Sequence, residues 1–296
     1  MRKGTYSIVA RDAGSGQLGV AVQSHWFSVG SVVTWGRTGV GVVATQSIAD
    51  PAYGPRLLDR FEAGEEPDAV LKALVAEDEA GRFRQVAAVD AKGMVAVHSG
   101  DGCIDHAGHE VGDEFSVQAN MMASPEVWPA MAEAFRASDG PLTRRLLAAL
   151  EAGEGAGGDV RGRQSAAMLV VAGEGEAWRR EAEIRVEDDP EPLAELRRLL
   201  DLHDAYALAS EGDDLTGQER FDEAGERYQR AAALVPDNQE LQFWSGLSLI
   251  KAGEVEKGAA AVRAVIEAND GWRDLLFRLD EVAPGVDEAR RALGLE

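Results

Sequence analysis

The sequence predicts an α+β domain whose antiparallel sheets lie between helical layers, followed by a smaller domain made only of helices. Three observations lead to this prediction. The expected strands come in neighbouring pairs joined by short turns, the expected helices come in two blocks between them, and the chain after Pro190 is helical in pattern throughout. At 296 residues, the chain is long enough for two domains with separate cores.

The strands of the first domain are predicted from alternating apolar and polar residues on either side of turn sequences. Residues 5–11 alternate, Asp12–Gln17 contains two glycines suited to a tight turn, and residues 18–24 alternate again. On the same grounds we expect four hairpins, formed by 5–11 with 18–24, 31–35 with 40–46, 85–90 with 94–98, and 165–171 with 180–186. A polar loop over 99–114 precedes one more short strand at 115–118.

Two blocks of helices interrupt these strands. One block is predicted over 53–63 and 66–77, where Pro67 lies close to the second helix start. The other is predicted over 124–137 and 140–152, and the glycine-rich residues 153–158 form a flexible break after it. Hairpins with helices in blocks favour sheets sandwiched between helical layers over a doubly wound parallel sheet.

The C-terminal part contains an internal repeat. The spacing of a tetratricopeptide unit is matched by Gly212, Ala224, Tyr228, Ala231 and Pro236, and a shift of 34 residues leads to Gly246, Gly258, Val262 and Val265. We expect helices over 192–209, 218–234, 239–252 and 255–268, with a capping helix after Gly271. An unrelated helical bundle with chance spacing is the alternative. Two repeats alone are marginally stable, so we expect docking onto the first domain or a partner, and we place the domains at 1–203 and 204–296.

The composition argues against several classes of partner. The net charge is −22, which opposes binding to nucleic acids and to anionic membrane surfaces. The single cysteine, Cys103, permits no intrachain disulfide, and no apolar run reaches the length of a signal-peptide core or a membrane span. We therefore expect a soluble protein in the cytoplasm.

Thr5 is the first candidate for chemistry. It follows Gly4 and begins the first predicted strand. If the Gly4–Thr5 bond were cut, Thr5 would carry a hydroxyl nucleophile and a free α-amine that titrates near ~8 and can act as its base. The alternative is an ordinary β-branched residue at a strand start.

Polar clusters interrupt the apolar strands at two further places. Gln23, Ser24 and His25 end the second strand and suit the rim of a site, although a turn with a hydrogen-bonded histidine explains them equally well. Gln118 and Asn120 precede a helix. The Asn120 side chain suits either a helix cap or a donor to an oxyanion.

A glycine-rich loop before a strand carries the last cluster. Asp159 and Arg161 in this loop could orient an amine or clamp a carboxylate, with a weak loop ion pair as the alternative. Gln164 and Ser165 follow directly. A strand and not a helix comes next, and a Walker-type lysine is missing, so we do not expect nucleotide binding.

Cys103, His106 and His109, with Asp101 and Asp105 nearby, contain metal-ligating residue types. Their spacing is not that of a zinc site, and structural packing of Cys103 is the favoured interpretation. We expect neither a metal nor another cofactor.

Several motifs together resemble a known family. They are Thr5–Asp12, Val20–Trp26, Ala44–Gln46, Tyr53–Arg56, Ser116–Met121 and Gly157–Ala167. Over about residues 4–200 the chain resembles domain-of-unknown-function family 1028, and this resemblance implies the N-terminal-nucleophile (Ntn) hydrolase fold, a four-layer αββα sandwich like that of proteasome β-subunits. Some members carry a C-terminal domain described as putatively peptidoglycan-binding, which would correspond to about 204–296.

The resemblance also implies roles for single residues. Thr5 matches the nucleophile, and the preceding Met1–Gly4 would have to be removed by autoproteolysis. Gln23 and Ser24 fall where related enzymes place a supporting aspartate, Asn120 falls near the oxyanion region, and Asp159 and Arg161 near a late aspartate-containing loop. The chain departs from the pattern because no lysine lies near the third and fourth strands. Arg11 or Arg37 would have to substitute for it.

Three hypotheses follow. In the first, the chain is an amidohydrolase acting on a small amide or peptide, with Thr5 as nucleophile, Asn120 holding the oxyanion and Asp159 orienting the amine. Substrate would then be bound by Gln23, Ser24, His25, Gln46, Gln118, Arg161, Gln164 and Ser165. In the second, the same fold binds a ligand without turnover. In the third, the helical repeats bind a peptide or a cell-wall fragment and the first domain mainly dimerises. A homodimer is expected in each case.

Overall fold

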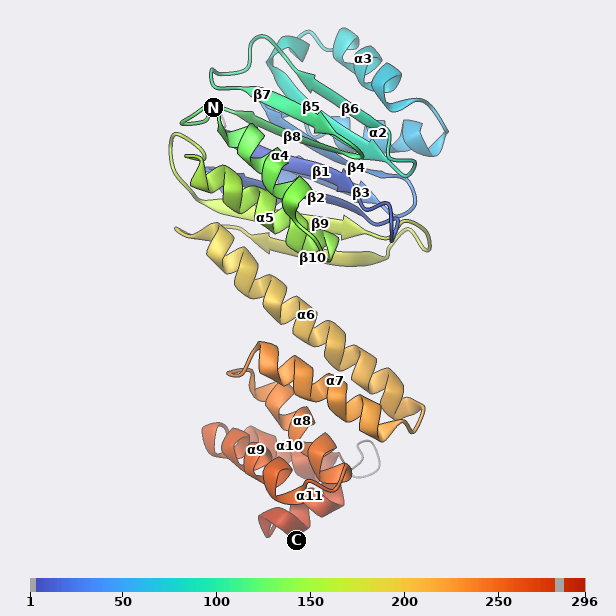
Figure 1. Cartoon of the computed structure of the whole chain (residues 1–296), viewed down its shortest axis with the longest axis vertical. Helices are drawn as coiled ribbons and strands as arrows, with labels where there is room; N and C mark the ends of the chain where they lie inside the picture. The colour runs from blue at the N-terminus through green and yellow to red at the C-terminus, as the bar shows by residue number, and fades with distance from the viewer. Residues whose placement is uncertain (1–3, 280–284, 296) are drawn as a thin grey trace. The chain divides into compact units, whose positions relative to one another are not determined.

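A computed structural model describes residues 4–279 and 285–295. The chain divides into two compact units, Met1–Arg198 and Leu199–Glu296 (Figure 1). The first is built of two antiparallel sheets with helices, and the second of helices. Among the described residues, every helix is too short or too polar to cross a bilayer.

The strands of the first unit form one sheet of six and one of four. The six-stranded sheet has the order β10-β9-β2-β1-β8-β7, with bounds β1 Thr5–Arg11, β2 Leu18–Ser24, β7 Gly108–Gly112, β8 Phe115–Asn120, β9 Ser165–Val171 and β10 Arg180–Val186. The four-stranded sheet has the order β3-β4-β5-β6, with bounds β3 Thr34–Arg37, β4 Gly41–Ser47, β5 Arg84–Asp90 and β6 Val95–Ser99. Strand β1 is central and pairs with β2 and β8.

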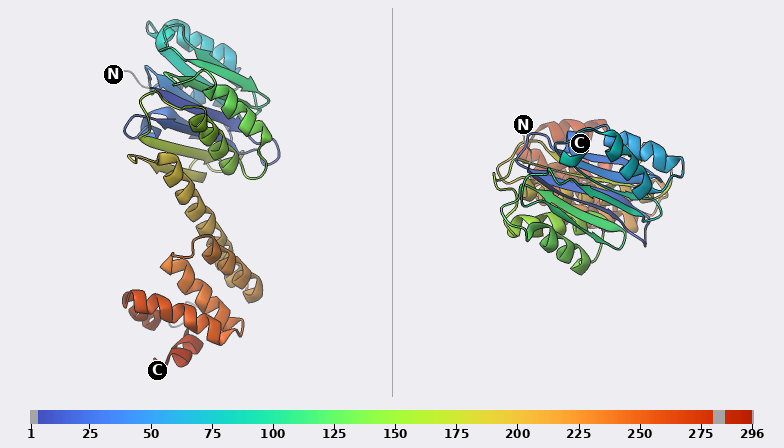
Figure 2. Two further views of the ribbon diagram at one scale, coloured as in Figure 1. Left: turned by 60° about the vertical axis from the view of Figure 1, so that its left-hand side comes forward. Right: turned by 90° about the horizontal axis from the view of Figure 1, so that it is seen from above.

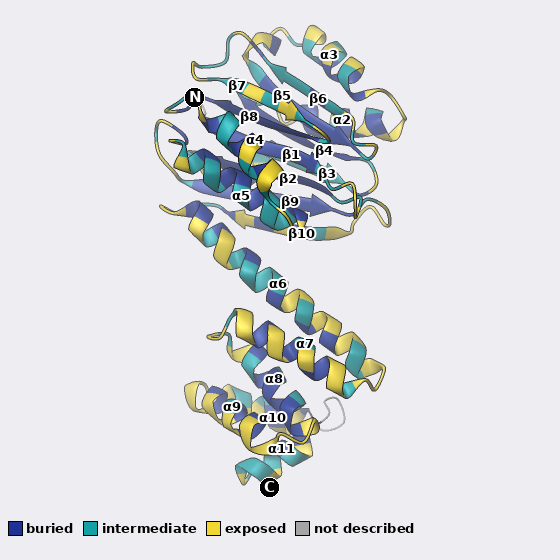
Figure 3. Cartoon of the chain, in the orientation of Figure 1, coloured by how far each residue is buried: buried dark blue, intermediate teal, exposed yellow. Residues whose placement is uncertain are grey.

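The sheets face each other across a core of small β-branched side chains. Val9 and Val20 from the six-stranded sheet pack with Val42 and Val89 from the four-stranded one. Alternate residues of β2 (Leu18, Val20 and Val22) and of β9 (Ala167, Leu169 and Val171) lie in this layer, which is what the alternating sequence pattern predicts. The central strands are buried along most of their length (Figure 3).

Helices cover the outer face of each sheet (Figure 2). Helices α2 Tyr53–Glu62 and α3 Pro67–Glu77 pack on the four-stranded sheet through a cluster that includes Leu57 and Leu71. Helices α4 Val127–Ala137 and α5 Leu142–Gly155 cover the six-stranded sheet. The approach is close, since a Cβ on Gly19 of β2 would lie 2.5 Å from Leu146 of α5. A 3₁₀ turn, Gly81–Phe83, precedes β5. Two antiparallel sheets therefore lie between helices.

Three local predictions are wrong. Residues 31–33, predicted as strand, lie in the short helix α1 Gly30–Val33, and strand begins only at Thr34. Gly30 approaches Ala167 of β9 so closely that a Cβ would lie 2.5 Å away, and the strand propensity of the valines is overridden here by the tertiary environment. The loop over 99–114 contains β7, a polar strand at the sheet edge. Residues 153–155 belong to α5 rather than to a flexible break.

The second unit is a series of helices. Their bounds are α6 Pro192–Gly217, α7 Phe221–Leu234, α8 Gln239–Lys251, α9 Val255–Ala268, α10 Gly271–Arg278 and α11 Val286–Leu293. Helix α6 is longer than the predicted 192–209. A Cβ on Gly212 would lie 2.9 Å from Tyr228, and a Cβ on Gly246 would lie 2.8 Å from Val262. The 34-residue spacing in the sequence thus marks one helix–helix contact that occurs twice.

Candidate functional site

Thr5 lies at the start of β1, where the strand is flanked by Ser24 of β2 and Asn120 of β8. Its side chain is on the face that looks toward the other sheet and is only 1% exposed. The Thr5 hydroxyl donates to the carbonyl oxygen of Gly4 at 2.7 Å and to the Ser24 hydroxyl at 3.1 Å. A buried hydroxyl group, which is a potential nucleophile, is thus in contact with the Gly4–Thr5 peptide group.

Two residues besides Thr5 also donate to the Gly4 carbonyl. It accepts from the Ser24 hydroxyl at 2.5 Å and from Nη2 of Arg161 at 3.0 Å. A guanidinium donor and a hydroxyl donor together polarise a carbonyl as an oxyanion site does. The hydroxyls of Thr5 and Ser24 also form a relay, because Thr5 donates to Ser24 and Ser24 donates to Gly4.

Asp159 positions Arg161. Its carboxylate accepts from Nε of Arg161 at 3.0 Å and from Nη2 at 2.7 Å, and the backbone N–H groups of Arg161 and His25 donate to it as well. The Asp159 side chain is fully buried. Removing Arg161 would leave this buried carboxylate without its compensating charge, which is destabilising. Asp159 therefore acts on the Gly4 carbonyl through Arg161.

Behind Thr5, a buried layer of amide side chains fills part of the space between the sheets. The Thr5 carbonyl accepts from Nε2 of Gln46 at 3.3 Å and from Nδ2 of Asn120 at 3.4 Å. Both amides also donate to Oε1 of Gln85, at 2.8 Å and 3.0 Å. Gln85 itself donates to the Ser99 hydroxyl and to the carbonyl of Ala119. Gln85 is thus the centre of the network.

The remaining members of this layer surround Ser7. Its hydroxyl donates to Oε1 of Gln46 and accepts from Nε2 of Gln118, both at 2.6 Å. Gln46 and Gln118, predicted as substrate-binding residues, are therefore hydrogen-bonded to Ser7 of β1, and Gln46 also to the Thr5 carbonyl. Ser7 and Gln85 were not predicted. Gln85 is the cross-strand partner of Gln46. A glutamine at one end of both β4 and β5 was the sequence feature that could have indicated its role.

Asn120 is not a helix cap, because α4 begins seven residues later at Val127. Its Nδ2 is engaged with Thr5 and Gln85, and its Oδ1 is buried and lacks a hydrogen-bond partner among the described residues. Asn120 thus offers an acceptor here and does not donate to the Gly4 carbonyl, which accepts from Thr5, Ser24 and Arg161.

Gln23 points to the opposite face of the sheet from Ser24, because neighbouring residues of a strand alternate. It is fully buried, and neither of its amide atoms has a hydrogen-bond partner within residues 4–279 and 285–295. Its cross-strand neighbour Tyr6 donates to Glu154 at 2.7 Å. Burial, followed by the charge of Glu154, raises the pKa of Tyr6 well above its usual value, so this phenol stays protonated. Gln23 is not directed at Thr5.

His25 and Gln164 line a neighbouring cavity of about 310 Å³ together with Arg163, Asp188, Asp189 and Pro190. Gln164 donates to Asp188 at 3.0 Å. Ser165 holds a loop in place, since its hydroxyl donates to the carbonyl of Trp26 and accepts from the N–H of Val29. The structure therefore brings Thr5, Ser24, Asp159 and Arg161 together and leaves His25, Gln164 and Ser165 around them.

The two arginines considered as substitutes for a lysine lie elsewhere. Arg11 pairs with Glu114 at 2.8 Å, and Arg37 pairs with Asp59 and Glu62. The hydrogen bond with Asp59 raises the pKa of Arg37. The cation at the site is Arg161.

The candidate metal ligands do not converge. Cys103 donates to the carbonyl of Arg84, while Nδ1 of His106 contacts the carbonyl of Met122 and Nδ1 of His109 contacts the Ser99 hydroxyl. Burial raises the pKa of the Cys103 thiol. The part of the chain that the structure describes contains no group of three such residues able to hold a metal ion.

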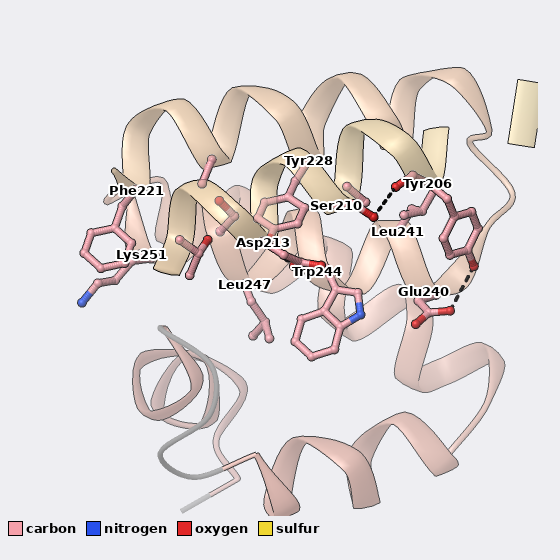
Figure 4. A pocket seen from close by; sticks show the side chains of 14 residues that line it. Tyr206, Ser210, Asp213, Phe221, Tyr228, Glu240, Leu241, Trp244, Leu247 and Lys251 are labelled. Atoms are coloured by element: carbon pink, nitrogen blue, oxygen red, sulfur yellow. Dashed lines mark hydrogen bonds between the residues drawn. The ribbon is translucent and has the colours of Figure 1, made fainter. Parts of the chain in front are cut away.

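A second cavity, of about 370 Å³, lies within the second unit between α6, α7 and α8 (Figure 4). Tyr206 donates to Glu240 at one end, Tyr228 donates to Asp213 in the middle, and Lys251 lies over the ring of Phe221 at the other end. Burial and Asp213 raise the pKa of Tyr228 to about 12. An apolar lining with a few polar groups is typical of a binding site, but the expected peptide or cell-wall ligand stays a prediction.

Comparison with known proteins bears on the first unit. A model of the family of unknown function DUF1028 matches residues 5–196. A crystal structure of a protein from Silicibacter pomeroyi, described as belonging to the same family, is similar to this chain with a TM-score of 0.61 and 33% sequence identity, covering 67% of this chain and 84% of that one. No curated protein matches the chain. The chain belongs to the family of unknown function DUF1028.

Proposed function

We propose that this chain is an N-terminal-nucleophile amidohydrolase that cuts its own Gly4–Thr5 bond and then uses Thr5 to hydrolyse a small amide or peptide. One observation carries the proposal. The Gly4 carbonyl accepts from Ser24 and Arg161 while the Thr5 hydroxyl lies 2.7 Å from the same oxygen. The placement of two antiparallel sheets between helices supports it, because this layer order is the one that the Ntn hydrolase fold has.

Self-cleavage begins with addition of the Thr5 hydroxyl oxygen to the carbonyl carbon of Gly4. The Thr5 proton passes to the Ser24 oxygen, and the Ser24 proton passes to the Gly4 oxygen, along the two existing hydrogen bonds. Before that proton arrives, Arg161 stabilises the negative charge that develops on the oxygen as the Thr5 oxygen adds to the carbonyl carbon. The C–N bond then breaks as the proton on the Gly4 oxygen moves to the nitrogen of Thr5. Gly4 is left as an ester on the Thr5 oxygen, and one water molecule hydrolyses it to a Gly4 carboxylic acid and a free Thr5 hydroxyl.

The mature enzyme repeats this chemistry on a substrate. The α-amine of Thr5, freed by cleavage, accepts the hydroxyl proton and later donates it to the leaving amine. A substrate carbonyl occupies the place of the Gly4 carbonyl, where Ser24 and Arg161 supply the donors. Asp159 is a positioning residue for Arg161. Asn120 and Gln46 hold the backbone of Thr5.

The test is intact mass together with N-terminal sequencing of the purified wild type and of three variants. The wild type should begin at Thr5, and Thr5→Ala should stay uncut. Arg161→Met should slow cleavage by about 100-fold, the usual effect of losing one oxyanion donor. Arg163→Met is the matched control, because Arg163 pairs with Glu154 and Glu191 and should leave the rate unchanged.

A folded wild type that keeps its residues before Thr5 on prolonged incubation would refute the proposal. The fully bonded Gly4 carbonyl would then be a structural feature, and a binding protein without turnover would be the better explanation. Residues 1–3, whose loss the proposal requires, lie outside the described residues.

A further inference from the structure

We infer that the site around Thr5 accepts acyl groups whose α-carbon carries no L side chain, glycyl groups above all, and that Asp159 imposes this preference. The inference rests on the proposed function and names the substrate class of the same site. It comes from the surroundings of Gly4, the residue whose carbonyl Thr5 contacts in the uncut chain.

The α-carbon of Gly4 lies directly against the carboxylate of Asp159. A Cβ added to Gly4 would lie 2.7 Å from Oδ2, 2.8 Å from Cγ and 2.8 Å from Oδ1 of Asp159. Contacts below 3.0 Å essentially never occur for real Cβ atoms, so something would have to move. The exclusion is therefore steric.

Asp159 has little freedom to give way. Its side chain is fully buried and accepts four hydrogen bonds, three from the backbone and guanidinium of Arg161 and one from the backbone of His25. Its own backbone forms a bridge with Met122. Moving the carboxylate away from Gly4 would also move Arg161 away from the Gly4 carbonyl. A side chain at this position would therefore either clash with Asp159 or displace Arg161, the donor that polarises the Gly4 carbonyl.

The same restriction applies to a substrate. Ser24 and Arg161 fix the position of any carbonyl that Thr5 attacks, because they are the donors that hold the Gly4 carbonyl. A substrate carbonyl held by them places its own α-carbon against Asp159. A glycyl group fits this space as Gly4 does, whereas the methyl group of an L-alanyl group meets the carboxylate.

The first experiment follows self-cleavage by mass spectrometry in the wild type, in Gly4→Ala and in the control Gly14→Ala. Gly14 is exposed, and a Cβ there would lie 3.6 Å from its nearest neighbour, so this variant should cleave like the wild type. Gly4→Ala should cleave at least about 100-fold more slowly, because one added methyl group can reduce the rate by about this factor in a tight pocket. Circular dichroism checks that both variants fold.

The second experiment uses mature wild type and needs no variant at Gly4. The 4-nitrophenyl esters of N-acetylglycine and N-acetyl-L-alanine are activated enough to report acylation of Thr5, with Thr5→Ala as the background. The glycyl ester should react with a kcat/KM about 100-fold higher.

The outcomes separate the two proposals. An uncut wild type would overturn the proposed function and the inference with it. A wild type that cuts, with Gly4→Ala cutting within about threefold of it, would overturn the inference alone. If Gly4→Ala does not fold, equal kcat/KM for the two esters would overturn it.

Discussion

Replacing Gln85 with methionine tests the amide network behind Thr5. Gln85 is fully buried in β5, accepts from Gln46 and Asn120, and donates to the Ser99 hydroxyl and the carbonyl of Ala119. Methionine has nearly the same volume, so the packing cost of the change is small. The substitution therefore isolates the hydrogen bonds.

The expected loss of stability in Gln85→Met depends on which neighbouring polar groups keep a hydrogen-bond partner. Gln46 retains bonds of 3.3 Å to the carbonyls of Thr5 and Gln118, and Asn120 retains only its 3.4 Å bond to Thr5. Two buried donors are thus weakened and several acceptors lose a partner. At about 0.5–1.5 kcal/mol for each of the four net hydrogen bonds, the first unit should lose about 2–6 kcal/mol of unfolding free energy.

Hydrogen–deuterium exchange of peptides from β1 and β5 measures this loss, because it reads the first unit separately from the second. Gln164→Met is the control, since Gln164 makes one solvent-exposed hydrogen bond to Asp188 and should change stability by less than about 0.5 kcal/mol. Equal opening free energies for Gln85→Met and Gln164→Met would show that the network contributes nothing to stability, and the reasoning would be wrong.

Two further changes have expected outcomes. Gly212→Ala should destabilise the second unit by about 1–3 kcal/mol, because its Cβ would lie 2.9 Å from Tyr228. In the control Gly217→Ala, the Cβ meets nothing within 4 Å, so this change should be neutral or slightly stabilising. Hydrogen–deuterium exchange of α6 peptides compares the two variants. The hydrogen bond from Arg84 lowers the pKa of Asp78, so this pair stabilises the first unit fully above about pH 4 and the contribution is lost as the pH falls through the lowered pKa. Urea unfolding at pH 7 and pH 3 should therefore show a weaker acid dependence in Asp78→Asn than in the wild type.

The fold could be predicted where a strand carries its own signal. Residues 165–171 and 180–186 were expected as strands and are β9 and β10 with the same bounds. Strand β7 was missed because a polar edge strand lacks apolar alternation and is recognisable only by its pairing with β8. The helical turn Gly30–Val33 was missed because its valines favour strand, and the contact of Gly30 with Ala167, far away in the sequence, leaves no signal in the local pattern.

The site divides in the same way. Ser24, Asp159 and Arg161 were noticed because polar residues interrupt an apolar strand or occupy a glycine-rich loop. The target of Arg161 could not be predicted, because the bond to Gly4 joins residues 157 positions apart. Gln85 looked like the polar end of a strand, and only the pairing of β4 with β5 places it beside Gln46.

The two donors on the Gly4 carbonyl should differ in what they contribute to cleavage. Hydrogen bonds accelerate a reaction only when they are stronger in the transition state than in the ground state. Ser24 is neutral, donates to the carbonyl and accepts from Thr5, so its part is to relay a proton. Arg161 is a cation at 3.0 Å whose attraction grows as charge develops on the oxygen. Because the buried Asp159 carboxylate fixes that guanidinium in advance, the charge stabilisation needs no rearrangement during the reaction.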